Sequence, residues 1–340
     1  MRTSANYIQI LIVIIAFILG WIADIPKSAK EEKHIHTSKD SMVFQDNERK
    51  DSVSKYTQDL FDHPGFFGPN FSDQPSKSSA SYKQATAEEA TVKNYTFKVS
   101  QKEADKKVCI DIFRSGRKLR SDCADLISKL AIVTAPDPGT DINGDGVPDV
   151  IAYEDTGAWH CCSTYAIFSL GKKLKLIDVL SGQHSYIFFR DLDGDGKYEA
   201  IGRDWTFAYW NTSFAGSPAP EVVLRWKNGK YRLAEDLMKT PPPEKKILLE
   251  IAEQFKENTL LDSKDQGLHW NSEWWAVMLK LIYNGNGNLA WEFCEWFWPI
   301  PEEKTLRKTF LKEKKLFLVE FKKQLRQSPY WADLKKMNGW

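Results

Sequence analysis

Two short segments of the chain carry oxygen-bearing side chains at alternate positions and match each other in residue type. They are DINGDGVPD (141–149) and DLDGDGKYE (191–199), and both fit the pattern D-x-[DN]-x-D-G-x-x-[DE]. Oxygen ligands at positions one, three, five, seven and nine can surround a hard cation, while glycine at position six permits a sharp chain reversal. Neither segment contains a thiol or an imidazole. The pattern therefore predicts two Ca²⁺ sites.

Neither loop has the features of an EF-hand. The twelfth position, which is a bidentate glutamate in an EF-hand, is Ala152 in the first copy and Gly202 in the second. Each loop is followed by an apolar, strand-like run and then by a predicted hairpin, at 167–180 in the first copy and 221–235 in the second. Loop, strand and hairpin therefore form a repeated unit of antiparallel sheet.

This repeated unit resembles the integrin-like calcium repeats of FG-GAP and VCBS proteins, which form blades of β-propellers on exported and surface proteins. The resemblance covers about residues 135–240; the FG-GAP string itself is absent, and two units cannot close a propeller, which needs about four blades. It implies an antiparallel β domain of blade-like sheets that binds two Ca²⁺ ions. The ligands that it implies are Asp141, Asn143, Asp145, Val147 (carbonyl) and Asp149 for one ion, and Asp191, Asp193, Asp195, Lys197 (carbonyl) and Glu199 for the other.

The number of carboxylates separates the two predicted sites. The second loop has four and the first has three, so charge counting predicts tighter Ca²⁺ binding at the second loop. The alternative for both loops is a pair of acidic turns that bind no metal. Extracellular loops of this kind often bind Ca²⁺ at concentrations far above those of the cytosol, which favours a domain in the periplasm or outside the cell.

A cysteine pair supports the same location. The segment 106–125 alternates apolar and polar residues around Ser115-Gly116, which predicts a hairpin. If Gly116 is at the tip, Cys109 faces Cys123 and the two can form a disulfide. The alternative is a register slipped by one residue, with two separate core thiols. A disulfide at this position indicates an oxidising compartment.

The only candidate for catalysis lies between the two loops. His160, Cys161 and Cys162 are adjacent, and His184 follows. A thiolate beside an imidazole can act as a nucleophile, so the alternative function is a cell-envelope hydrolase that uses His160 and Cys161 near the second calcium loop. Adjacent cysteines on a strand point to opposite faces and are poorly placed to share a zinc ion. The residues around them match no known nucleophile motif, so we expect a binding role, with one core thiol or an oxidised pair here.

The chain begins with a segment typical of a membrane anchor. Residues 7–25 contain one amide, Gln9, and one charge, Asp24, and a helix of this length is about 28 Å long, enough to span a bilayer. We predict a signal anchor, or transmembrane helix, over 1–25. A cleaved signal peptide is the alternative, although the large Trp21 disfavours cleavage after residue 23. Residues 26–92 show no helical or strand period and predict a flexible tether.

The aromatic run at 204–220 contains Trp205, Phe207, Tyr209 and Trp210 in imperfect alternation, which predicts a strand with two faces. Its aromatic side chains can pack in the core or bind a glycan or peptide. We expect core packing. This run lies inside the predicted calcium-binding β domain, residues 93–240.

The last part of the chain, 241–340, predicts a Trp-rich helical domain. The hydrophobic period changes to about 3.6 residues after a proline-rich break at 240–244. Two helices separated by an NGNGN turn are faintly similar to a tetratricopeptide hairpin, and Cys294 is expected to be a core thiol. The last helix is amphipathic, with Leu306, Phe310, Phe317, Phe321 and Leu325 on one side. The predicted helices cover 245–261, 272–283, 288–298 and 302–328.

Composition limits the possible functions. The chain has 340 residues, and its 47 Lys and Arg against 46 Asp and Glu give a net charge of +1, which does not favour nucleic-acid binding. The predicted fold class is α+β, with an N-terminal transmembrane helix, a domain of propeller-blade-like sheets with two calcium loops, and a helical domain. We therefore expect a membrane-anchored, exported Ca²⁺-binding protein of the cell envelope, with a structural or interaction role toward an unknown protein or glycan.

Overall fold

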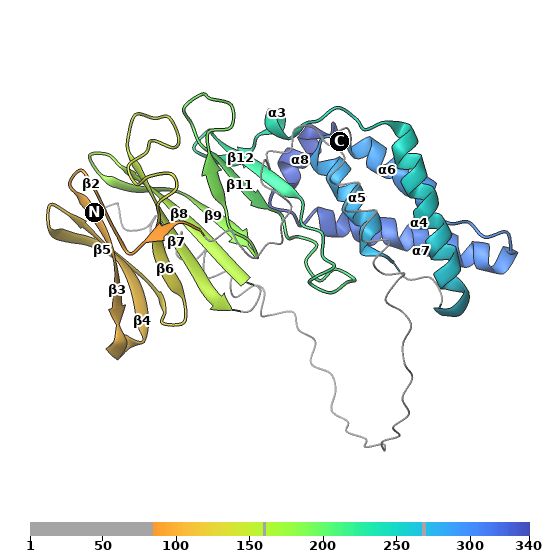
Figure 1. Ribbon diagram of the computed structural model, residues 1–340, viewed down its shortest axis with the longest axis horizontal. Helices are drawn as coiled ribbons and strands as arrows, with labels where there is room; N and C mark the ends of the chain where they lie inside the picture. The colour runs from red at the N-terminus through yellow and green to blue at the C-terminus, as the bar shows by residue number, and fades with distance from the viewer. Residues whose placement is uncertain (1–83, 159–160, 267–269) are drawn as a thin grey trace, which may run out of the picture. The chain divides into compact units, whose positions relative to one another are not determined.

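The computed structural model describes residues 84–158, 161–266 and 270–340 (Figure 1). These residues form antiparallel sheets followed by helices, as the predicted α+β class requires. Within these ranges, no helix is long and apolar enough to cross a bilayer. The predicted anchor, 1–25, lies outside the described residues, and so does most of the predicted tether.

The strands of the described part form three sheets, each built on a four-stranded antiparallel meander (Figure 1). The first meander contains β2 (Glu89–Val92), β3 (Tyr95–Lys102), β4 (Lys107–Arg114) and β5 (Arg117–Asp125). The second contains β6 (Lys129–Val133), β7 (Asp149–Ala158), β8 (Cys161–Leu170) and β9 (Leu174–Gln183), and β1 (Thr86–Ala87) pairs with β6. The third contains β10 (Phe188–Arg190), β11 (Glu199–Arg203), β12 (Glu221–Lys227) and β13 (Lys230–Leu233). The strands therefore begin before residue 93.

Two-residue turns close the predicted hairpins. Ser115 (φ 49°) and Gly116 (φ 77°) join β4 to β5, and Asn228 (φ 53°) and Gly229 (φ 82°) join β12 to β13. Both turns need two residues with positive φ, which is the type I′ geometry that suits the right-handed twist of a hairpin. The turns fix the register, so the hairpins predicted at 106–125 and 221–235 are present in the structure.

The register of the first hairpin brings its two cysteines together. Cys109 on β4 lies directly opposite Cys123 on β5, with their Cα atoms 4.0 Å apart. Their sulfur atoms are joined as a disulfide. Cys109 is fully buried and Cys123 is exposed, and the disulfide connects the two strands of the hairpin.

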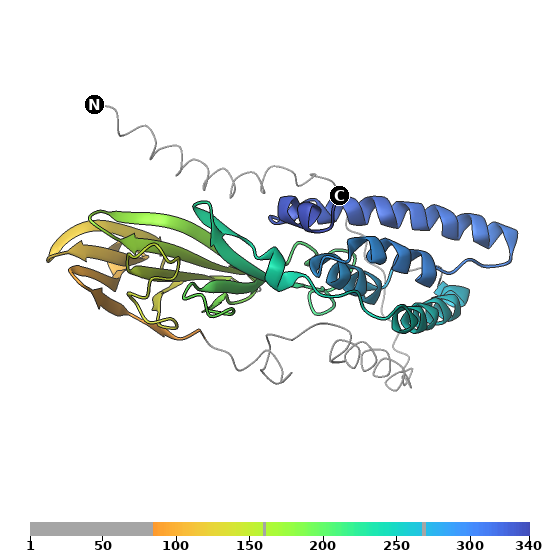
Figure 2. The same cartoon turned by 90° about the horizontal axis from the view of Figure 1, so that it is seen from above.

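The helices follow the last sheet. They are α3 (Glu235–Met238), α4 (Lys245–Gln266), α5 (Ser272–Tyr283), α6 (Gly287–Phe297), α7 (Lys304–Leu325) and α8 (Trp331–Met337), and a short 3₁₀ turn, η1 (Glu103–Asp105), lies between β3 and β4. The Asn271 side chain caps α5 by accepting a hydrogen bond from the N–H of Glu273 (2.9 Å). Pro299 follows α6 and prevents its continuation. Figure 2 shows α7 running alongside the α5–α6 pair.

One aromatic core holds these helices together. Phe317 of α7 packs against Trp298 (ring centroids 5.5 Å apart) and Trp274 (6.2 Å). The same hydrophobic cluster continues without a break into the second and third sheets. The amphipathic side of α7 is therefore buried, as predicted, from Phe310 to Leu325. The prediction is wrong for Leu306, because 51% of this residue is exposed.

The segment 204–220 is not a strand. It consists of turns and bends between β11 and β12, so the predicted two-sided strand is wrong. Its aromatic side chains are nevertheless used in packing: Phe207 is buried against Phe321 of α7, and the Trp210 ring lies 4.9 Å from that of Trp275. The hydrophobicity of this run reflects its burial under the helices.

Cys294 lies on α6 and is completely buried. Burial raises the pKa of its thiol to about 12, so almost no thiolate forms at neutral pH and no reagent reaches it. We expect iodoacetamide at pH 8 to leave the Cys294 peptide unmodified in the native protein and to modify it fully in urea, as measured by peptide mass spectrometry. The Cys109 and Cys123 peptides are the internal control, because their disulfide must be reduced before iodoacetamide can modify either residue. Rapid native labelling of Cys294 would contradict this packing.

Candidate metal centre

The two acidic loops occupy equivalent places in successive meanders. The first connects β6 to β7, and the second connects β10 to β11, so each joins the first strand of its meander to the second. Position nine of each loop is the first residue of the following strand: Asp149 begins β7 and Glu199 begins β11. Both side chains are buried, with 2% and 0% exposed. The repeat in the sequence is therefore also a repeat in the structure.

Side-chain oxygens hold the two loops in the same shape. The side chain at position one accepts hydrogen bonds from the backbone N–H groups of positions four and six. The side chains at positions three, five and nine accept hydrogen bonds from the backbone N–H groups of positions five, seven and two, respectively. These bonds run from Gly144 and Gly146 to Asp141, Asp145 to Asn143, Val147 to Asp145 and Ile142 to Asp149 in the first loop, and from Gly194 and Gly196 to Asp191, Asp195 to Asp193, Lys197 to Asp195 and Leu192 to Glu199 in the second.

Glycine at position six of each loop serves the predicted reversal. Gly146 has a φ of +80° and Gly196 a φ of +83°, a conformation that side chains with a Cβ rarely adopt. An added Cβ would meet no atom within 4 Å at either position. The requirement for glycine is therefore conformational, and it allows the sharp reversal of the chain in both loops.

Asp149 gives the first loop a polar atom without a partner. Its Oδ2 accepts the N–H of Ile142 (3.1 Å), while its Oδ1 is buried and has no hydrogen-bond partner among the described residues. Burial raises the pKa of Asp149 to about 7 and the negative charges of Asp145 and Asp141 add to the rise, while the Ile142 N–H and the nearby Ser169 hydroxyl oppose it. A buried carboxylate needs a partner, and a cation in the loop would supply one.

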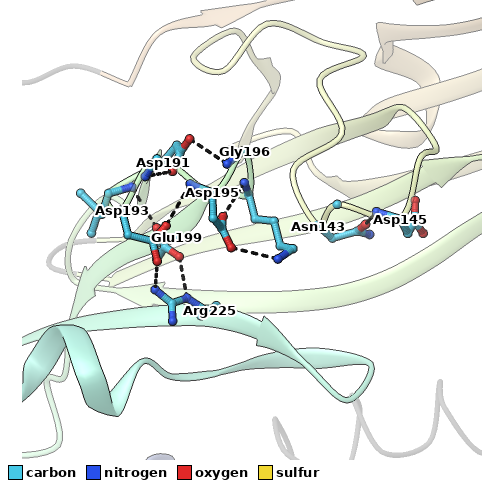
Figure 3. Close-up of polar contacts among 12 residues, drawn as sticks. Asn143, Asp145, Asp191, Asp193, Asp195, Gly196, Glu199 and Arg225 are labelled. Carbon is cyan, nitrogen blue, oxygen red and sulfur yellow. Dashed lines mark hydrogen bonds and ion pairs between the residues drawn. The ribbon is translucent and has the colours of Figure 1, made fainter.

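The second loop brings three carboxylates together. One oxygen of each of Asp191, Asp193 and Asp195 lies within 4.8 Å of the others. The side-chain ammonium of Lys197 pairs with Asp195 Oδ2 (2.9 Å) and lowers the pKa of that carboxyl. Figure 3 shows the carboxylates of Asp193 and Glu199 directed toward the guanidinium of Arg225, which projects from β12, while Asp191 is directed toward Gly196.

The two loops are in contact. The N–H of Tyr198, in the second loop, donates to the carbonyl of Ile142, in the first (2.9 Å). The Lys197 side chain lies over Gly144, where an added Cβ would be only 2.8 Å from its Cε. The two candidate sites therefore form one acidic region built by two neighbouring sheets.

The residues predicted as candidates for catalysis lie in different surroundings. Cys161 and Cys162 begin β8 with their sulfur atoms next to each other, and His160 lies outside the described residues. The His184 ring lies against Trp205 (5.3 Å) and Phe214 (5.2 Å).

Sequence reasoning missed two charged residues, Arg225 beside the second loop and Asp204 after β11. Arg225 reaches the second loop because β12 pairs with β11, and that register is not visible in a single hairpin sequence. Asp204, at the start of the aromatic run, is buried with 1% exposed and accepts hydrogen bonds from Tyr283 and Ser328. An isolated acid before an aromatic run was the available signal for Asp204.

Comparisons with models of protein families, with curated proteins and with solved structures find no match to this chain.

Proposed function

We propose that this protein is a membrane-anchored, exported Ca²⁺-binding protein, in which Ca²⁺ stiffens the sheets that carry the two loops. The observation that carries the proposal is the buried Oδ1 of Asp149, which has no partner among the described residues. Carboxylate and carbonyl oxygens in a flexible loop are the ligands that Ca²⁺ prefers. The residues that would hold the ions are those of positions one, three, five, seven and nine in each loop.

Repulsion between the acids explains why a cation would be structural. In the first loop, Asp141, Asp145 and Asp149 carry three negative charges when all are ionised, and none of them forms an ion pair with a described residue. The burial of Asp149 makes its charge costly. A divalent cation would offset both the repulsion between the acids and the cost of burying the Asp149 charge. It would also fix the loop against the start of β7. The Val147 and Lys197 carbonyls complete the two ligand sets that the repeat pattern implies.

Fold topology supports the likeness to integrin-like calcium repeats. The described strands form three successive four-stranded antiparallel meanders, each paired in chain order, and a propeller blade is also a four-stranded sheet. The acidic loop occurs at the same step of the second and third meanders. Sheets of this kind present loops and strand edges to a partner, so the proposed role is to bind a protein or glycan of the cell envelope. Ca²⁺ would act by holding that surface in one shape.

Two features support a location outside the cytoplasm. The disulfide between Cys109 and Cys123 requires an oxidising compartment to persist. The apolar segment 7–25 has the length and composition of a membrane anchor. Together they favour an anchored protein whose folded part is periplasmic or extracellular, where Ca²⁺ is abundant.

Calorimetry tests Ca²⁺ binding directly. We expect two Ca²⁺ ions to bind the chelator-treated, full-length protein in detergent. Asn143→Ala is expected to weaken the first site and Asp193→Ala the second, each by about tenfold or more, because each removes one oxygen ligand.

The control is Asp137→Ala, which removes an exposed carboxylate just before the first loop. It is expected to change both dissociation constants by less than about twofold, because an exposed charge outside the ligand set is screened. If the Asn143 and Asp193 variants take up Ca²⁺ like the wild type, the loops are acidic turns and the proposal is wrong.

A further inference from the structure

We propose that Arg225 is an internal cation of the second loop, and that it makes the first loop the site that Ca²⁺ fills first. This inference rests on the proposed function, because it assigns an order and a competitor to the same two sites. It reverses the order that carboxylate number predicts.

The contacts of Arg225 use both ends of the second loop. Its Nη2 donates to Asp193 Oδ2 (2.5 Å), at position three, and its Nε donates to Glu199 Oε1 (2.8 Å), at position nine. Its Nη1 donates to Asp236 Oδ2 (2.8 Å), at the start of α3. Only 23% of the Arg225 side chain is exposed, and Glu199 is fully buried. The guanidinium is therefore held in a fixed position by three carboxylates, two of which, Asp193 and Glu199, are labelled in Figure 3.

These contacts occupy oxygens that Ca²⁺ would use. The other oxygen of Asp193 accepts the N–H of Asp195, and the other oxygen of Glu199 accepts the N–H of Leu192. Each of these two carboxylates therefore has a protein donor on both oxygens. A Ca²⁺ ion that binds both must displace the guanidinium or share oxygens with a positive charge a few ångströms away, and either event weakens binding.

Strand register makes Arg225 specific to the second loop. In the second meander, Asp149 at position nine lies opposite Ser169 of β8. In the third, the pairing of Ala200 with Leu224 continues to place Glu199 opposite Arg225. The same position of the repeat is thus a small neutral residue beside the first loop and a cation beside the second.

Charge balance follows from this difference. The second loop has four carboxylates, but Arg225 and Lys197 pair with three of them and leave a net charge of −2. The first loop has three carboxylates, no ion pair with a described residue, and the unpartnered Asp149 Oδ1. The second loop is therefore stabilised without a metal, while the first depends on one.

The test measures each site separately in the full-length protein in detergent, by calorimetry with CaCl₂. Asp145→Ala disables the first loop and reports the second; Asp195→Ala disables the second and reports the first. We expect the first site to bind at least about tenfold more tightly than the second. In the Asp145→Ala background, Arg225→Ser, which installs the residue type of the first loop, is expected to tighten the second site by about tenfold.

Two further variants keep the test decisive. Arg225→Gln removes the charge but can still donate a hydrogen bond to Glu199, so it serves if the serine variant does not fold, and we expect it to tighten the second site as well. Arg232→Ser is the matched control: Arg232 lies directly opposite Arg225 on β13, but its ion pair is with Asp333 (3.3 Å). It is expected to change the second site by less than about twofold, because a charge that does not contact the loop is screened.

The outcomes separate the two claims. If the second site is the tighter one, or if neither Arg225 variant changes its affinity, then Arg225 does not compete with Ca²⁺ and the inference is overturned. Equal effects of the Arg225 and Arg232 variants also overturn it, because the change in affinity would then come from the net charge of the protein and not from contact with the loop. If the wild type binds no Ca²⁺ at either loop, the proposed function fails, and the inference fails with it.

Discussion

Asp204→Ala is expected to lower the free energy of unfolding by about 4 kcal/mol. Asp204 is buried and accepts four hydrogen bonds. They come from the backbone N–H (2.8 Å) and hydroxyl (2.5 Å) of Thr206, and from the hydroxyls of Tyr283 (2.6 Å) and Ser328 (2.5 Å). Alanine would remove this acceptor from the buried hydroxyls of Tyr283 and Ser328, and each unsatisfied buried group costs about 1–3 kcal/mol.

The effect is large because Asp204 joins three parts of the chain. It follows β11, Tyr283 ends α5, and Ser328 follows α7. The same carboxylate thus ties the third sheet to both helices. Urea unfolding followed by circular dichroism measures the loss. Asp122→Ala is the matched control, because Asp122 forms only an exposed pair with Arg120 (2.6 Å), and exposed pairs contribute about 0–1 kcal/mol.

A double-mutant cycle shows whether the network causes the loss. Tyr283→Phe alone is expected to cost about 1 kcal/mol, and to cost almost nothing once Asp204 is alanine, because its partner is already gone. Additive losses from the two substitutions would mean that the hydroxyl and the carboxylate act independently. A loss below about 1 kcal/mol for Asp204→Ala would contradict the role of this network.

Local signals in the sequence located most of the elements, but long-range contacts were not predictable. The helix predicted at 272–283 coincides with α5 because an asparagine cap and a glycine-rich turn bound it on either side. The run 204–220 was predicted as a strand because its aromatic spacing resembles a strand period, but those rings pack on α5 and α7. Periodicity reports which residues are buried, and not always which element buries them.

In the candidate site, too, local features were predictable from the sequence and long-range contacts were not. The loop pattern specifies positions one to nine, and the structure places the two copies at equivalent steps of two meanders. Arg225 was not predictable, because its distance from Asp193 and Glu199 depends on the pairing of β11 with β12. Burial of Asp149 was equally hidden, since an acid at the edge of a loop is usually exposed.

Asp149→Asn is expected to change stability in opposite directions with and without Ca²⁺. In EDTA at pH 8, the wild type must bury an ionised carboxylate whose Oδ1 has no described partner, so removing its charge is expected to raise the free energy of unfolding by about 1 kcal/mol. In Ca²⁺ at 100 times the dissociation constant, a bound site adds about 2.7 kcal/mol. Asp149→Asn is expected to lose much of this Ca²⁺-dependent stabilisation and to be less stable than the wild type in Ca²⁺.

The sign of the pH dependence follows from the same group. The pKa of Asp149 is about 7 in the folded, metal-free protein and lies near its ordinary value of 3.8 in the unfolded chain. Between these values the folded state holds a proton that the unfolded state has released. The stability of the metal-free wild type is therefore expected to fall as pH rises from about 4 to about 7, and this fall is expected to be smaller in Asp149→Asn.

Glu199→Gln is the matched control, because it removes the charge at position nine of the other loop. Glu199 is paired with Arg225 (2.8 Å), so its neutralisation leaves a guanidinium with one partner fewer and is expected to destabilise the protein in EDTA. The two variants should thus have opposite effects without metal, measured by thermal and urea unfolding. If Asp149→Asn lowers stability equally in EDTA and in Ca²⁺, the first loop does not depend on a metal for its charge balance.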